Sequence, residues 1–175
     1  MCMVDMPGRY FTFVYIFFTM KDNKKVYLLG ISGFKGSGKT TLIEKLLPSL
    51  KQLNVKTAII KHTSEPLAVD ESGGDTARFY RAGADVLGFD GRCVFTKSRI
   101  EDDFGLNDAR ERLGGRYDLV LAEGFKNSSL EKIWLLREND NHPPREIENI
   151  IKVLSWDDDR LRQVRLVIEA ELGLV

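Results

Sequence analysis

One run, Gly33-Phe34-Lys35-Gly36-Ser37-Gly38-Lys39-Thr40, constrains the fold of this chain more than any other segment. Its spacing is G-x-x-x-x-G-K-[ST], the pattern of a loop that binds phosphate between a strand and a helix. An apolar run at 26–32 precedes it and predicts a buried parallel strand. Apolar residues recur at helical spacing after it, which predicts a helix that Pro48 should strain or kink. The motif therefore stands in its required context, and an ordinary glycine-rich turn is a poor explanation.

The residue types in this motif suit a nucleoside triphosphate. Glycines let the backbone curl so that successive amides point at phosphate oxygens, and the following helix adds its positive N-terminal end. Lys39 supplies a flexible positive charge for the β- and γ-phosphates, which makes it a candidate catalytic residue. Thr40 offers a hydroxyl to Mg²⁺, and Thr41 can donate to a phosphate. The predicted nucleotide contacts in this segment are Gly33, Phe34, Lys35, Gly36, Ser37, Gly38, Lys39, Thr40 and Thr41.

An acidic strand end completes the predicted magnesium site. In the run from Asp118 to Glu123, the two acids point to opposite faces because side chains alternate along a strand. Glu123 stands at the carboxyl end, where ligands bind in open α/β sheets. We predict that Glu123 holds Mg²⁺ or its water shell with Thr40 and is the second catalytic residue. Its competing interpretation is a solvated loop acid, and Asp118 is expected to end the preceding turn.

Two further segments follow the second predicted strand, 55–60. Lys61 and His62 stand at its carboxyl end. We predict that Lys61 contacts the nucleotide or an anionic substrate and that His62 is a packing residue. The glycine-rich stretch Asp70–Thr76 is placed to order around a γ-phosphate and Mg²⁺ as a switch. Within it, Asp75 is either a further magnesium ligand or the N-cap of a helix, and the sequence leaves both interpretations open.

The rest of the chain alternates between predicted strands and helices. This alternation indicates a P-loop NTPase fold of three layers, α/β/α, with a mostly parallel sheet. Asp157-Asp158-Asp159 suits the start of the last helix, because acids stabilise the positive end of a helix. The expected elements are helices at 75–82, 106–113 and from 157 onward, and strands at 84–89, 93–97, 118–122, 132–136 and 150–154.

An apolar segment at 10–20, rich in aromatic residues, stands outside this pattern. It is about half as long as the ~20 residues that a helix needs to cross a membrane, and no small-residue cleavage site follows. We therefore expect neither a membrane span nor a signal peptide. Residues 1–22 are an apolar extension: an extra strand, a poorly ordered arm, or a leader translated ahead of a start at Met20. Residues 23–175 are the predicted nucleotide-binding domain.

The charge balance limits the partners of the chain. Lysines and arginines number 26 and aspartates and glutamates 26, so the formal net charge is zero. Such a chain has no overall positive potential to hold nucleic acid or an anionic membrane. A local cationic pocket is still compatible with a net charge of zero. The 2 cysteines are too few for a disulfide framework or a four-ligand zinc site, which favours reduced thiols in a cytoplasmic protein.

The residue that reads the base is not marked by a known motif. Thr96-Lys97-Ser98-Arg99 lacks the final acid of the N-K-x-D or T-K-x-D pattern that reads guanine. The loop Ser155-Trp156-Asp157-Asp158, after the last predicted strand, is placed for this contact. A carboxylate there could accept hydrogen bonds from the N1 and N2 groups of guanine. Helix capping by the same aspartates is the competing interpretation.

Several short motifs follow the glycine-rich loop in one order: Ile60-Lys61-His62, Val69-Asp70, Gly74-Asp75-Thr76, Arg81-Ala82-Gly83-Ala84, Leu121-Ala122-Glu123-Gly124-Phe125-Lys126 and Lys132-Ile133. From about Val26 onward the chain resembles the molybdopterin-guanine dinucleotide biosynthesis protein B family, MobB. The resemblance implies a dethiobiotin synthetase-like fold, GTP with Mg²⁺, weak GTPase activity and a homodimer. It also implies an accessory or adaptor role beside the nucleotidyltransferase that attaches GMP to molybdopterin. In the wider fold group, acids at the positions of Asp75 and Glu123 hold Mg²⁺.

Two other functions stay open on the sequence alone. A small-molecule kinase or ATP-dependent ligase on the same fold would need an anionic-substrate pocket, for which Lys61, Arg78 and Lys126 are candidates. A binding module without turnover would use the nucleotide only as a structural ligand. No residue is an obvious base for activating water, so we expect slow hydrolysis.

Overall fold

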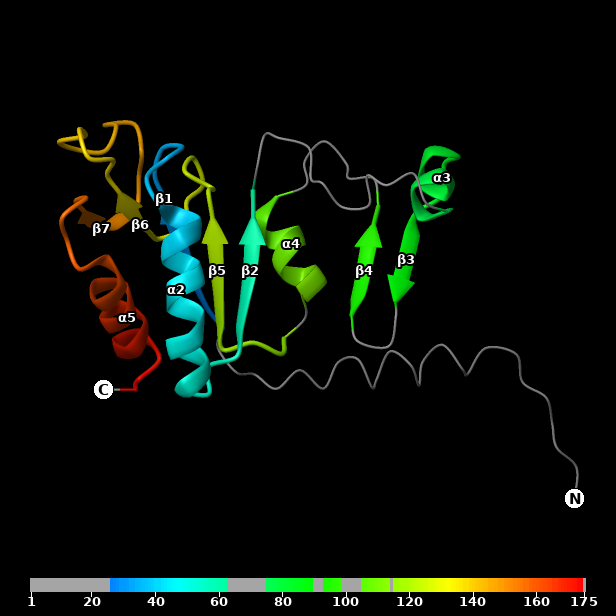
Figure 1. The fold of residues 1–175 in the computed structure, drawn as a ribbon, viewed down its shortest axis with the longest axis horizontal. Coiled ribbons are helices and arrows are strands. Elements are labelled where there is room, and N and C mark those ends of the chain that lie inside the picture. Colours follow the sequence, from blue (N-terminus) through cyan, green and yellow to red (C-terminus); the bar gives the residue numbers. More distant parts are fainter. Residues whose placement is uncertain (1–25, 63–74, 90–92, 99–104, 114, 175) are drawn as a thin grey trace, which may run out of the picture.

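Five parallel strands form the central sheet of the computed structural model, which describes residues 26–62, 75–89, 93–98, 105–113 and 115–174 (Figure 1). The strands lie in the order β2-β5-β1-β6-β7, and all neighbouring pairs run parallel. This confirms the predicted mostly parallel sheet and makes β1, which leads into the glycine-rich loop, its middle strand. Their bounds are β1 (Tyr27–Ser32), β2 (Thr57–Lys61), β5 (Leu119–Glu123), β6 (Lys132–Leu135) and β7 (Ile150–Leu154).

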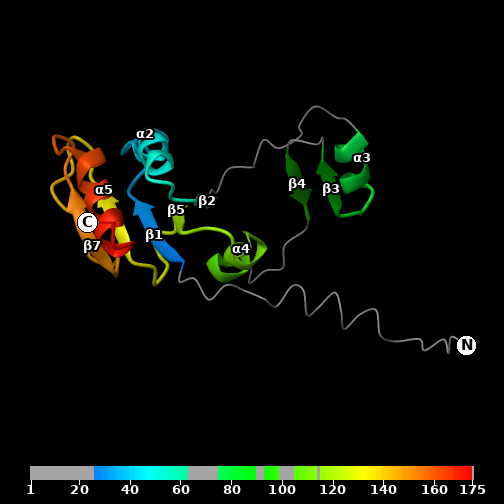
Figure 2. The same cartoon turned by 90° about the horizontal axis from the view of Figure 1, so that it is seen from below.

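Helices cover both faces of this sheet. On one face α2 (Lys39–Gln52) and α5 (Arg160–Glu171) pack against the buried side chains of Leu29 and Ile31 in β1. On the other face α4 (Leu106–Leu113) packs against Ala58 and Val120. Figure 2 shows α2 and α4 on opposite sides of the sheet. The alternation of side chains along each strand therefore builds three layers, as predicted.

The larger core lies between the sheet and the pair α2 and α5. Leu46 and Leu50 of α2 and Val164 and Ile168 of α5 are fully buried there. Cutting a leucine such as Leu46 back to alanine in a core of this kind costs about 2–5 kcal/mol. The helical spacing of apolar residues in the sequence thus fixes which side of each helix faces the sheet.

Pro48 lies inside α2 and does not end it, because the helix continues to Gln52. The proline lacks an amide donor, so one hydrogen bond is lost within the helix. The helix ends where Asn54 takes a left-handed backbone conformation, with a φ of 58°, and Val55 then donates to the carbonyl of Leu50. Asparagine tolerates this conformation better than most residues, which makes it a common helix stop.

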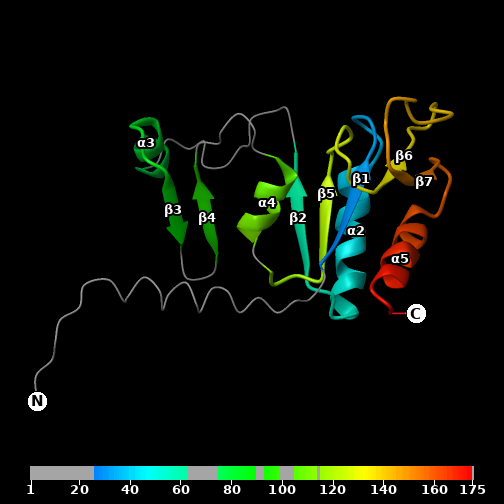
Figure 3. The ribbon, with the colours of Figure 1, turned by 180° about the vertical axis from the view of Figure 1, so that it is seen from behind.

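A smaller unit consists of α3 (Asp75–Arg81) and the strands β3 (Val86–Phe89) and β4 (Val94–Lys97). The two strands pair antiparallel with each other as a separate sheet. In Figures 1 and 3 this unit lies at the opposite end of the molecule from α5. The sequence predicts these elements, but not that they stand apart from the parallel sheet. The predicted extension 1–22 and Asp70 lie outside the described residues.

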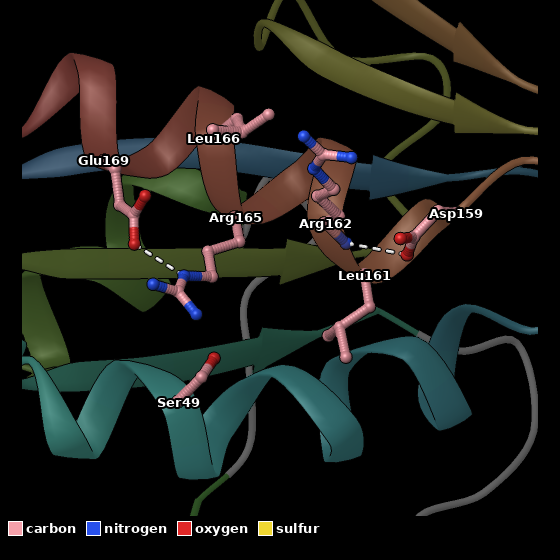
Figure 4. A pocket seen from close by; sticks show the side chains of 7 residues that line it. All are labelled: Ser49, Asp159, Leu161, Arg162, Arg165, Leu166 and Glu169. Atoms are coloured by element: carbon pink, nitrogen blue, oxygen red, sulfur yellow. Dashed lines mark hydrogen bonds and ion pairs between the residues drawn. The ribbon is translucent and has the colours of Figure 1, made fainter. Parts of the chain in front are cut away.

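Between α2 and α5 lies an open groove of about 410 Å³, in which Leu161 and Leu166 stand among charged side chains (Figure 4). Its lining residues, which include Ser49, Asp159 and Arg162, belong to neither the glycine-rich loop nor the strand ends that carry Lys61 and Glu123. In the described part of the chain, no helix is both long enough and apolar enough to cross a membrane.

Candidate nucleotide-binding site

The glycine-rich loop follows β1 directly, and its glycines take conformations that other residues would resist. Gly38 forms the N-cap of α2 with a φ of 86°, in the left-handed region. A Cβ on Gly33 would lie 2.5 Å from the carbonyl oxygen of Leu135 and 2.5 Å from Oγ of Ser37. Glycine is therefore required at both positions. The loop curls tightly enough for Ser37 to donate its backbone amide to the carbonyl of Phe34 over 3.2 Å.

Lys39, the first residue of α2, reaches back over this loop. Its Nζ donates to the carbonyl oxygens of Gly33, at 2.9 Å, and Phe34, at 2.8 Å. Burial lowers the pKa of this ammonium group, the nearby carboxylate of Glu123 raises it in part, and Lys61 lowers it further. A half-buried ammonium held by two neutral carbonyls gains strongly from an anion. The role of Lys39 at the phosphates stays a prediction.

Thr40 and Glu123 meet across the loop. The hydroxyl of Thr40 donates to Oε1 of Glu123 over 2.9 Å, although the two residues are 83 positions apart in the sequence. Glu123 ends β5 and is only 7% exposed, so the solvated-acid interpretation does not describe it. Asp118, at the other end of this strand, accepts from the backbone amide of Lys56 over 2.8 Å, as expected of a residue that ends a turn.

Lys61 joins the same group through the register of the sheet. It stands directly opposite Glu123 in the parallel pairing of β2 with β5, and its Nζ lies 3.6 Å from Oε1 of Glu123. Lys61 is half exposed, so it can also reach a bound anion. The ring of His62 lies beside that of Phe125, with 5.3 Å between centroids, and the residue is exposed.

The structure does not bring Asp75 to this group. Asp75 begins α3, is largely exposed, and lies 3.3 Å from Arg78 in an ion pair within the same helix. α3, which also carries Arg78, stands away from α2 and β2 in every view (Figures 1–3). Among the described residues, no three histidine, cysteine or acidic side chains cluster as a metal site would require. The magnesium role of Asp75 stays a prediction from the resemblance.

The remaining predicted contacts lie around the mouth of the loop. Phe34 sets its ring edge-on to Trp134, with 5.6 Å between centroids, and the guanidinium of Arg137 lies 4.7 Å from the centroid of Phe34. The side chains of Lys35, Thr40 and Thr41 are exposed, and Gly36 lies at the exposed turn of the loop. These ring contacts hold Phe34 beside β6, and its contact with the nucleotide stays a prediction.

The loop and its neighbours fit a magnesium–triphosphate. The hydroxyl of Ser37 is buried inside the loop and has no hydrogen-bond partner in the described part of the chain. The hydroxyl of Thr40 and the carboxylate of Glu123 are the hard oxygen ligands that Mg²⁺ prefers. Lys39 and Lys61 place two positive charges beside them.

Sequence reasoning missed Arg160, which ties the loop to the far side of the site. It lies in the first turn of α5, and its Nη1 donates to the carbonyl of Ser37 over 2.8 Å. Its Nη2 donates to the carbonyl of Leu136, and its Nε donates to that of Ser155 over 2.6 Å. Burial lowers its pKa, while Asp158 and Asp157 raise it. No spacing in the sequence marks such an arginine, because its acceptors are backbone groups of distant segments.

For the aspartates before α5, the two interpretations are helix capping and contact with the base. Asp158 accepts from the backbone amide of Ser155 over 2.6 Å, and this bond lowers its pKa. Asp159 is the N-cap and accepts from the amide of Arg162 over 3.2 Å (Figure 4). Asp159 thus caps the helix as that interpretation predicts, whereas Asp158 closes the turn that precedes the helix. Asp157 is exposed and makes no hydrogen bond among the described residues, so it alone keeps its carboxylate for another partner.

The sheet and the site define a class: a three-layer α/β protein with a phosphate-loop motif at the end of its central strand. Within that class, the model of the family described as molybdopterin guanine dinucleotide synthesis protein B matches residues 28–156, and the chain belongs to this family.

Individual relatives support this assignment. The chain is 36% identical over 141 residues to the molybdopterin-guanine dinucleotide biosynthesis adapter protein of Haemophilus influenzae, a match that covers 78% of each chain. It is 33% identical over 132 residues to the Escherichia coli protein of the same name, covering 73% of this chain and 75% of the relative. A crystal structure of molybdopterin-guanine biosynthesis protein B superimposes with a TM-score of 0.64 at 26% identity, covering 85% of this chain and 99% of the other.

Proposed function

We propose that this chain binds GTP with Mg²⁺, hydrolyses it slowly, and serves as an adaptor in the conversion of molybdopterin to its guanine dinucleotide form. The observation that carries the proposal is the contact of Thr40 with Glu123, 2.9 Å long, beside the loop that Lys39 spans. The relatives from Haemophilus influenzae and Escherichia coli are named biosynthesis adapter proteins, which supports the adaptor role.

Each residue of the site would bind the phosphates or Mg²⁺ according to its charge. Backbone amides of the loop would hold phosphate oxygens, and Lys39 would exchange its two carbonyl partners for phosphate. Thr40 and Glu123 would hold Mg²⁺, which when bound offsets the negative charge on the β- and γ-phosphates. Lys61 would add a second cation at the terminal phosphate.

Slow hydrolysis follows from how Glu123 is held. Its carboxylate already accepts from Thr40 and pairs with Lys61, so it is poorly placed to take a proton from water as well. A site that binds tightly and reacts slowly suits a protein whose nucleotide state sets its affinity for a partner. We propose that the partners are the nucleotidyltransferase and its molybdopterin substrate, and that the chain acts as a homodimer.

Removal of the Lys39 ammonium tests the nucleotide site. Lys39→Ala should weaken Mg²⁺–GTP binding at least about tenfold in titration calorimetry, because a charge-assisted contact to phosphate is lost. Lys45→Ala, an exposed lysine on the same helix, is the matched control and should bind as the wild type does. Circular dichroism of both variants should show the wild-type fold. Equal GTP affinity of Lys39→Ala and wild type would overturn the proposal.

Base preference separates the adaptor from a small-molecule kinase or ATP-dependent ligase. The pocket that such an enzyme would need was expected to include Arg78, which the structure holds in α3 beside Asp75. Titration of the wild type with GTP and ATP in parallel should show the tighter affinity for GTP. A strong preference for ATP would contradict the adaptor proposal.

A further inference from the structure

The sheet order indicates where the base of a bound nucleotide would lie. Thr40 and Glu123 mark the terminal-phosphate end of the site, because Mg²⁺ joins the β- and γ-phosphates. Glu123 ends β5, on one side of β1, whereas β6 and β7 lie on the other side. A nucleotide with its γ-phosphate near Glu123 therefore extends its nucleoside across β1 toward the carboxyl ends of β6 and β7. This direction rests on the proposed function.

An aromatic ring stands where the nucleoside would arrive. Trp156 follows β7 by two residues and is 47% exposed, although tryptophan is usually well covered in a folded chain. The guanidinium of Arg160 lies 5.1 Å from its ring centroid and covers one face. The exposed area therefore belongs to the other face and the ring edges.

Arg160 fixes this ring relative to the phosphate loop. The same guanidinium that covers Trp156 donates to the carbonyl of Ser37 inside the loop, 2.8 Å away. It also donates to carbonyls at the ends of β6 and β7, including Leu154 at 3.4 Å. One side chain thus connects the phosphate loop, both strand ends and the ring, which pre-organises a surface at a set place beside the phosphates.

We infer that Trp156, backed by Arg160, is the surface on which the purine base of the bound nucleotide stacks. A flat indole face and a flat purine stack with little regard to which purine it is. Trp156 therefore supplies affinity for the base, and the hydrogen-bonding groups around it supply the choice of guanine. Arg160 is a positioning residue, since it acts through Trp156 and the loop.

The test compares ligands with and without a base. Titration calorimetry measures binding of GTP and of inorganic tripolyphosphate, each with Mg²⁺, to the wild type, Trp156→Ala and Trp156→Phe. We expect Trp156→Ala to bind GTP about tenfold more weakly, the loss of one base–aromatic stacking contact, with tripolyphosphate binding unchanged. Trp156→Phe should restore most of the GTP affinity. Leu166→Ala, another exposed apolar residue, in the groove of Figure 4, is the control and should match the wild type.

Fluorescence gives a second readout of the same contact. The chain has 2 tryptophans, and Trp134 is fully buried, so acrylamide quenches mainly Trp156. GTP should protect Trp156 from acrylamide, and tripolyphosphate should not. Arg160→Lys keeps the charge but cannot reach all of the carbonyls, so it should raise quenching of Trp156 in the absence of ligand and reduce the protection by GTP.

The outcomes separate this inference from the function on which it rests. If the wild type binds GTP and Trp156→Ala binds it equally well, the stacking surface is wrong and the nucleotide site stands. If Trp156→Ala weakens GTP and tripolyphosphate to the same extent, the ring only shapes the loop, and the inference is again overturned. If the wild type binds neither ligand, the proposed nucleotide site fails and the stacking surface fails with it.

Discussion

Glu123 shows how far single residues could be predicted. The sequence places it at the carboxyl end of a strand. Parallel strands have their carboxyl ends at the same edge of the sheet, so Glu123 is expected near the other strand ends. The structure agrees, because Thr40 and Lys61 both contact its carboxylate. The sequence does not show the partners of a side chain, however. Asp75 is also an acid that could hold Mg²⁺, but it pairs with Arg78 within α3, beside the two-stranded sheet.

Removal of the charge on Glu123 tests its place in the magnesium site. Glu123→Gln keeps the shape of the side chain, so we expect the hydroxyl of Thr40 to keep an acceptor. GTP binding with Mg²⁺ should weaken by at least about tenfold, because a metal ligand loses its charge, and binding in EDTA should change little. Calorimetry of wild type and variant under both conditions measures this difference. Glu44→Gln, an exposed acid on α2, is the control. An identical Mg²⁺ dependence in wild type and Glu123→Gln would exclude Glu123 from the site.

At the level of elements, local patterns carry most of the prediction. Apolar periodicity locates α2 and α5, and the apolar run before the motif locates β1 within one residue of its start. Pairing is harder, because it depends on contacts between distant segments. The composition of β3 and β4 predicts two strands. Their residues do not predict that the two strands form a sheet of their own. Arg160 was not predicted for the same reason: it binds backbone carbonyls, which every residue has and which therefore mark no position in a sequence.

Tyr27, at the start of β1, should make the stability of this strand depend on pH. Its hydroxyl is buried without a hydrogen-bond partner among the described residues. Burial first, and then the charges of Glu171 and Glu131, raises the pKa of this phenol from 10.0 to about 12. The folded state therefore keeps the proton while the unfolded chain loses it. The resulting stability is fully present below pH 10 and is lost as the pH rises from 10 toward 12.

Tyr27→Phe should remove this part of the pH dependence. Urea unfolding at pH 9 and pH 11 measures the free energy of unfolding of both proteins. We expect the wild type to lose about 1 kcal/mol more than the variant between the two values, after allowing for solvent screening at a half-buried group. At pH 9 the variant should be at least as stable as the wild type, because it buries no unpaired hydroxyl. An equal loss in the two proteins would show that Tyr27 titrates as it does in the unfolded chain.

On the scale of the whole molecule, the unit of α3, β3 and β4 is built on a sheet of its own and not on the parallel sheet. It exposes three large apolar side chains: Phe79 at 59%, Leu87 at 61% and Val94 at 66%. A two-stranded sheet is marginally stable by itself in water. Exposed apolar side chains that gather on one unit are typical of an interaction surface. If the chain forms the proposed homodimer, we expect a second copy of the same unit to cover them.

A charge on this unit should therefore separate the two chains. Leu87→Glu places a carboxylate where a partner would bury it, whereas in a single chain the position is exposed and a charge there costs little. Light scattering coupled to size-exclusion chromatography should show the wild type as a dimer and Leu87→Glu shifted to the monomer. Leu166→Glu, exposed on α5, should stay dimeric. Because Leu87 lies away from the phosphate loop, each Leu87→Glu chain should still bind one GTP with wild-type affinity. A dimer that survives Leu87→Glu would place the contact elsewhere on the molecule, and a monomeric wild type would contradict the proposed homodimer itself.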